Sequence, residues 1–258
     1  MNSVAMALCA AAVTFAGGGI GLLLRRKLPP RYTQSRSKDM IASVSGLMTL
    51  LTALVTGLLI WTAYGVYSGQ NVAVQNYAAR ALQEDLALAD YGADAASGRA
   101  KLRERLARTV IDMWGAPSDA EFVNRNYHAA VENLRTGQAY LDSLRPTTEP
   151  QRLALAAANQ AHAAVAQTRL QMALALTDPV SYPLLTVVII WATFLFCGYG
   201  LSAGGNRMAY AAMAVGALAF STAVFVIVDL STPYSGVFKA SSAPIERIIK
   251  DVDKQEGH

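Results

Sequence analysis

MIASVSGLMTLLTALVTGLLIWTAYGVY, residues Met40–Tyr67, contains no Asp, Glu, Lys or Arg. The hydrocarbon core of a bilayer is about 30 Å thick, and roughly 20 apolar residues in a helix cross it. Three further uncharged runs are long enough to do the same: Val4–Leu24, Val180–Ala203 and Met208–Val228. Because no water satisfies backbone polar groups inside a bilayer, all four segments are predicted to be helices. The sequence therefore predicts an all-α membrane protein with four transmembrane helices.

The four spans divide the 258 residues into four parts. Residues 1–67 hold the first two spans, 68–178 form one extramembrane block, 179–230 hold the last two spans, and 231–258 form a tail. Hydrophobic residues make up 53% of the chain and charged residues only 16%, which is typical of a membrane protein.

Basic residues are concentrated in the loop at residues 25–39, between the first two spans, where six of the 22 Lys and Arg residues face a single Asp. The block 68–178 is close to neutral, with 11 basic and 12 acidic residues. Short basic loops stay cytoplasmic, so we predict that this loop lies inside and that both termini and the block lie outside. The basic character is thus explained by topology. We expect a multi-pass protein of the cell inner (plasma) membrane, surrounded by lipid and without a nucleic-acid partner.

Helical patterns continue through the extramembrane block. The second span is predicted to run on as one helix of roughly 50–55 residues that ends at Gly98. Further helices are predicted over Arg99–Trp114, Glu121–Leu144 and Gln151–Leu176, so the block is expected to be an extracytoplasmic helical bundle. Its carboxylates recur at helix-surface spacings and are interpreted as solvated.

The tail contains a short amphipathic helix from Pro244 onward, with Ile245, Ile248, Ile249 and Val252 on one face. Two placements are open at this point. The apolar face lies on the membrane surface, or it packs on the helical bundle.

Three stretches carry a resemblance to a known family: Ser43–Gly46 with Leu50–Gly57, Arg169-Leu170 with Pro183–Leu185, and Asn206–Met208 with Asp229-Leu230 and Pro233–Gly236. In order and spacing they resemble the bestrophin-like family of bacterial integral membrane proteins, a family labelled as a domain of unknown function. The chain departs from the family pattern at Tyr234, where Phe is usual, and at Ser231-Thr232. The resemblance implies kinship with bestrophin anion channels and hence an ion channel.

A stripe of hydroxyl side chains follows one face of the second span. Its members recur at intervals of four, three and four residues: Ser45, Thr49, Thr52 and Thr56. In one interpretation they line a pore between several copies of the chain, where hydroxyls replace part of the hydration of an ion. In the other they bond carbonyls of their own helix or a neighbouring helix.

Small residues form stripes on two other spans, namely Gly17 and Gly21 on the first and Ala212, Gly216 and Ala219 on the fourth. Such stripes let helix backbones approach closely, so we interpret them as helix-packing surfaces, within one chain or between chains.

Three residues near the outer membrane interface are candidates for an outer vestibule: Arg169, Asp229 and Tyr234. Arg169 would attract anions there. The alternative for Asp229 is an interfacial ion pair with an outer basic group such as Arg169.

Nothing in the sequence indicates an enzyme. The three histidines have no metal-site spacing, and we find no phosphate-binding loop, nucleophile elbow or HExxH motif. We therefore expect no cofactor and no metal. The leading hypothesis is a cyclic homo-oligomeric ion channel with the pore between subunits. The alternative is a non-conducting membrane protein whose outer helical domain binds a partner or senses envelope conditions.

Overall fold

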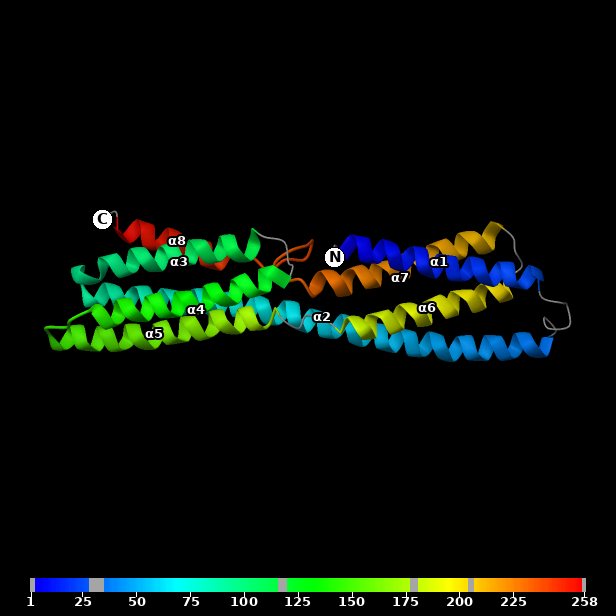
Figure 1. The fold of residues 1–258 in the computed structure, drawn as a ribbon, viewed down its shortest axis with the longest axis horizontal. Helices are drawn as coiled ribbons and strands as arrows, with labels where there is room; N and C mark the ends of the chain where they lie inside the picture. Colours follow the sequence, from blue (N-terminus) through cyan, green and yellow to red (C-terminus); the bar gives the residue numbers. More distant parts are fainter. Residues whose placement is uncertain (1–2, 28–34, 116–119, 177–180, 204–206, 257–258) are drawn as a thin grey trace. The chain divides into compact units, whose positions relative to one another are not determined.

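The computed structural model describes residues 3–27, 35–115, 120–176, 181–203 and 207–256. These residues form helices and no strands, which confirms the predicted all-α class (Figure 1). The helices follow one another in the order α1 (Ser3–Lys27), α2 (Ser35–Tyr91), the 3₁₀ turn η2 (Ala93–Ala95), α3 (Ala96–Trp114), α4 (Ala120–Ser143), α5 (Glu149–Leu174), α6 (Tyr182–Ser202), α7 (Arg207–Leu230) and α8 (Ala243–Glu256).

Four helices of the described chain are long and apolar enough to cross a membrane. They are α1, the Asp39–Tyr91 part of α2, α6 and α7. Each of these helices overlaps one of the four uncharged runs, so the long apolar segments of the sequence correspond to the long apolar helices of the structure.

The chain divides into two compact units. The first, here called the membrane unit, comprises Met1–Gly65 and Val180–Ser231. The second, here called the bundle unit, comprises Val66–Pro179 and Thr232–His258. Helix α2 contributes its first half to the membrane unit and its second half to the bundle unit.

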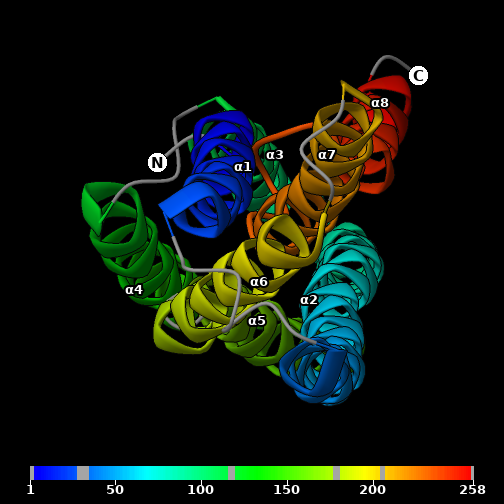
Figure 2. The same ribbon diagram turned by 90° about the vertical axis from the view of Figure 1, so that its right-hand side faces the viewer.

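In the membrane unit, α6 lies between α1 and α2 (Figure 2). Small residues bring α1 and α6 together, since a Cβ at Gly21 would collide with the carbonyl oxygen of Cys197 and one at Gly200 with the carbonyl oxygen of Gly18. Helix α7 packs on α1, where Ser221 Oγ donates a hydrogen bond of 2.8 Å to the Ala7 carbonyl.

The core of the bundle unit is formed by α2, α3, α5 and α8 together with part of the tail. Leu102, Leu106 and Met113 of α3 are fully buried there, and so is Ile245 of α8. The tail helix therefore packs on the bundle, which settles the alternative that the sequence leaves open. Helix α5 begins with a capping box between Thr148 and Gln151.

The end of α2 was predicted wrongly. The helix ends at Tyr91, and the next residue, Gly92, has a φ of 106°. This left-handed region is accessible to glycine at little cost and stops the helix. Gly98 instead lies inside α3, where a Cβ would collide with the ring of Tyr140.

Candidate functional site

The first two members of the hydroxyl stripe, Ser45 and Thr49, make their contacts inside the chain. Thr49 Oγ1 lies 2.7 Å from the Ser45 carbonyl, one turn earlier, and 2.8 Å from the hydroxyl of Tyr199 in α6. A Cβ at Gly198 would come within 2.9 Å of Ser45 Oγ. Ser45 and Thr49 thus face α6, as expected if these hydroxyls bond their own helix or a neighbouring helix.

Thr52 and Thr56 differ from the other threonines of the membrane unit. Thr14, Thr186 and Thr193 each donate to the carbonyl four residues earlier, at 2.7–2.9 Å. The hydroxyl oxygens of Thr52 and Thr56 are buried and have no hydrogen-bond partner within the described chain. These two hydroxyls are one turn apart on the same face of α2, so they form a short unsatisfied polar stretch within the apolar run Met40–Tyr67.

The small residues of α1 and those of α7 have different surroundings. Gly17 and Gly21 lie against Thr193 and Cys197 of α6, in the same chain. On α7, Gly216 lies near the ring of Phe196, whereas Ala212 and Ala219 are exposed. The first group has its partner in the chain, and part of the second has a free face.

The three vestibule candidates are buried. Asp229 is fully buried in the membrane unit and accepts a hydrogen bond of 2.8 Å from Ser3 Oγ. Tyr234 is buried in the bundle unit, where its hydroxyl donates to Gln70 and its ring meets Trp114 edge-on at 4.9 Å. The vestibule role stays a prediction, and these contacts give both residues a structural role.

The third candidate, Arg169, is 2% exposed and lies in the core of the bundle unit. Its Nη2 donates a hydrogen bond of 2.7 Å to Asn126 Oδ1. Its Nε and Nη1 are buried and have no partner within the described chain. Burial lowers the pKa of Arg169, and the nearby Tyr77, Tyr234 and Asp112 only partly offset that effect.

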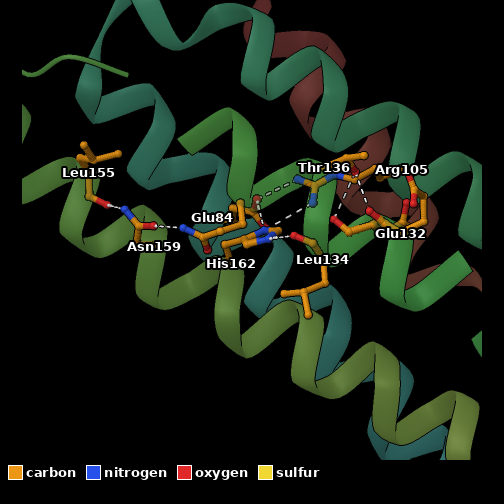
Figure 3. A network of polar contacts seen from close by, with 10 residues as sticks. Glu84, Arg105, Glu132, Leu134, Thr136, Leu155, Asn159 and His162 are labelled. Carbon is orange, nitrogen blue, oxygen red and sulfur yellow. Dashed lines mark hydrogen bonds and ion pairs between the residues drawn. The ribbon is translucent and has the colours of Figure 1, made fainter. Parts of the chain in front are cut away.

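A buried polar network lies in the same core (Figure 3). Glu84 Oε1 of α2 accepts a hydrogen bond of 2.8 Å from Arg105 Nη2 of α3. The same oxygen lies 3.1 Å from Nδ1 of His162 in α5. The other ring nitrogen of His162 lies 3.2 Å from the Leu134 carbonyl of α4. A carbonyl only accepts, so this nitrogen donates. The network ties all four helices together.

The pKa of Glu84 reflects competing effects. Burial alone would raise the pKa of this carboxyl. The hydrogen bond with His162 and the positive charge of Arg105 outweigh burial and hold the pKa below its ordinary value. Glu84 is therefore an ionised carboxylate in the core at neutral pH.

This network escaped the sequence analysis, which interpreted the carboxylates of the block as solvated. That interpretation was wrong for Glu84 and Asp85, each 1% exposed. Asp85 forms a two-bond ion pair with Arg99, at 2.8 and 2.9 Å. Their partners are 14 to 78 residues away in sequence, so local periodicity does not reveal the pairs. An indication was available in the sequence, because two acidic residues, Glu84 and Asp85, are adjacent in a largely apolar stretch of the helix.

The apolar helices and the all-α fold define a multi-pass helical membrane protein. The family model described as a bestrophin-like domain matches residues 12–245. The chain therefore belongs to the bestrophin-like family, as its motifs predict. No match was found among curated proteins or among solved structures.

Proposed function

We propose that the chain is a non-enzymatic, homo-oligomeric ion channel of the bestrophin-like kind, with its pore between subunits. It would be a multi-pass protein of the inner (plasma) membrane, with both termini outside and the loop at residues 25–39 in the cytoplasm. Family membership and the four long apolar helices support the membrane part of this proposal. The absence of Asp, Glu, Lys and Arg from the four apolar runs argues against a proton-coupled transporter.

The observation that carries conduction is the pair of unpartnered hydroxyls at Thr52 and Thr56. A buried hydroxyl without a partner costs free energy, and hydrocarbon offers no substitute for the missing hydrogen bond. Water or a partly dehydrated ion would satisfy both oxygens. Ser45 and Thr49 contact α6, and the hydroxyl oxygens of Thr52 and Thr56 are shielded within the single chain, so a pore between subunits requires this face of α2 to open toward the neighbouring subunit.

The test is ion flux into liposomes that contain the purified full-length chain. A salt gradient drives chloride or potassium, and the wild type is compared with Thr52→Val, which keeps the shape and removes the hydroxyl. We expect ion-selective flux in the wild type and a reduction of about tenfold in the variant, because every subunit then contributes one fewer hydroxyl to the pore.

Thr186→Val is the matched control. The Thr186 hydroxyl is exposed at the start of α6 and bonds its own helix, so flux should stay at the wild-type level. Absence of flux in the wild type across a broad pH range would overturn the channel. Equal flux in wild type and Thr52→Val would overturn the assignment of Thr52 to the pore.

The second candidate is the non-conducting protein whose helical bundle binds a partner or senses envelope conditions. The buried ion pair of Glu84 and Arg105 favours it, because an ionised carboxylate in a core responds to pH and to bound ions. Hydrogen exchange of α3 and α5 at pH 7 and at pH 3.5, where Glu84 begins to take up a proton, tests it. A large change in protection without any flux would favour this candidate, and unchanged protection would count against it.

A further inference from the structure

The core of the bundle unit holds more positive than negative charge. Arg169 and Arg105 both have buried guanidinium nitrogens without partners within the described chain. Glu84 is the carboxylate bonded to Arg105, whereas the bond from Arg169 goes to the neutral amide of Asn126. An arginine stays charged in proteins, so the charge of Arg169 is not balanced by an adjacent acid.

The other polar groups near Arg169 do not supply the missing negative charge. Burial raises the pKa of Tyr77 and of Tyr234, so both phenols are neutral at physiological pH. The negative charge of Asp112 also favours the charged form of Arg169, but the Asp112 side chain is exposed on α3. A buried, uncompensated cation is costly, which makes an additional anion in this core favourable.

A small cavity lies where that anion is needed. It is lined by residues of α2, α3, α4 and α5, among them Tyr77, Arg105, Asn133, His162 and Arg169. Its volume is ≈ 10 Å³, about the room that one water-sized particle occupies. Chloride is larger than a water molecule, so its binding requires small shifts of the lining side chains, and phosphate, sulfate and carboxylates are larger still.

We propose that this cavity binds a single monoatomic anion, chloride under physiological conditions, between the guanidinium groups of Arg105 and Arg169. Chloride accepts the hydrogen bonds of the free guanidinium N–H groups and balances their charge. Water would accept the same bonds but would leave the charge unbalanced. The lining residues lie outside the four uncharged apolar runs, and the site does not depend on whether the chain conducts.

The structure also offers a route to the cavity. Arg105 and Asn133 line a second, larger pocket of ≈ 330 Å³ at the surface between α3 and α4. Lys101 and Arg108 lie in the same pocket and, with Arg105, outnumber its two acids, Glu104 and Glu132. Arg108 pairs with Glu104 and Arg105 with Glu84, so this pocket exposes Arg105 without a marked excess of positive charge.

The experiment measures the Tm of the full-length chain in detergent, in sodium chloride, sodium bromide or sodium gluconate at equal ionic strength. A ligand that binds only the folded chain raises Tm. We expect chloride and bromide to raise Tm by roughly 3–6 °C above the value in gluconate. Arg169→Gln should abolish that difference. Arg152→Gln, in the same helix at a side chain that is 65% exposed, should keep it.

An equal Tm of the wild type in all three salts would overturn the proposal, and so would a chloride effect that survives in Arg169→Gln. If that variant does not fold, crystals of the wild type grown in bromide decide the question. An anomalous peak within hydrogen-bond distance of both guanidinium groups supports the site. A cavity that holds only water overturns it.

Discussion

A single buried carboxylate, Glu84, bonds to side chains of two other helices in the bundle unit. Its pKa is lowered in the folded chain, so folding favours its ionised form. That contribution to stability is complete above its ordinary pKa of 4.5 and is lost as pH falls through the lower, folded value. The carboxylate therefore stabilises the bundle at neutral pH and ceases to do so in acid.

Glu84→Gln should lower the free energy of unfolding by about 3 kcal/mol at pH 7, because it leaves Arg105 buried without its ionic partner. Thermal unfolding in detergent, measured from pH 7 down to pH 3.5, gives the difference between variant and wild type. The difference should shrink below pH 4.5. Glu149→Gln, at a carboxylate that is 68% exposed, is the control and should leave Tm unchanged. A pH-independent difference would contradict the role of ionised Glu84.

The contact between α1 and α6 gives a second prediction for a single residue. Gly21→Ala should destabilise the membrane unit by about 1–3 kcal/mol, since the added Cβ collides with the carbonyl of Cys197. Gly19→Ala makes the same change in the same helix with nothing within 4 Å of the new Cβ. Unfolding of both variants in detergent should show a lower Tm for the first only. Equal Tm values would mean that the helices separate at no cost.

The tail helix α8 is held to the bundle by one apolar face. Ile245→Ala removes a fully buried side chain and should cost about 2–5 kcal/mol. Limited proteolysis should then cleave the tail near Ser242 faster than in the wild type. Leu153→Ala, at a side chain that is 66% exposed in α5, should leave the cleavage rate unchanged. Unchanged cleavage in Ile245→Ala would show that α8 does not depend on this contact.

At the scale of elements, the sequence predicts most helices well because spans and amphipathic faces repeat locally. The predicted Arg99–Trp114 and Gln151–Leu176 helices match α3 and α5 to within a few residues. The end of α2 was missed because two glycines, Gly92 and Gly98, are equally plausible helix stops by residue type. Only the backbone conformation and the contact with Tyr140 distinguish them.

The candidate sites were harder to predict, since their partners come from different helices. The periodicity of the hydroxyl stripe identifies a face of α2 but not the helix that covers it, which is α6 at Tyr199. Arg169 was singled out, yet its burial and its partner Asn126, 43 residues away, depend on how α4 and α5 pack. Tertiary pairing decides which charged residues are buried, and one sequence carries little information about it.

At the scale of the whole molecule, the membrane unit presents apolar side chains outward. Leu50, Leu54 and Trp61 of α2 are each at least 70% exposed. Lipid covers such bulky residues as well as protein does, so exposure alone does not define a subunit interface. Exposed small residues are more informative, because close backbone approach between helices is what they permit.

The proposed homo-oligomer therefore has a testable interface on α7. Ala212 and Ala219 are exposed on one stripe of this helix, on either side of Gly216. Changing both alanines to leucine adds bulk where two subunits would approach closely, so native mass spectrometry in mild detergent should show fewer subunits per particle. Ala211→Leu, on the neighbouring exposed face with Val215 and Leu218, is the control and should keep the wild-type assembly.

The possible results distinguish two questions: whether the oligomer exists, and which face of the chain forms its interface. A wild-type chain that is monomeric in several mild detergents and in lipid nanodiscs would contradict the homo-oligomer, and with it a pore between subunits. An oligomer that persists when Ala212 and Ala219 become leucine would place the interface on another face, and the exposed side of α2 would be examined next. An oligomer lost in the double variant and kept in Ala211→Leu would place the subunit contact on the small-residue stripe of α7, where the backbones of two helices can approach closely.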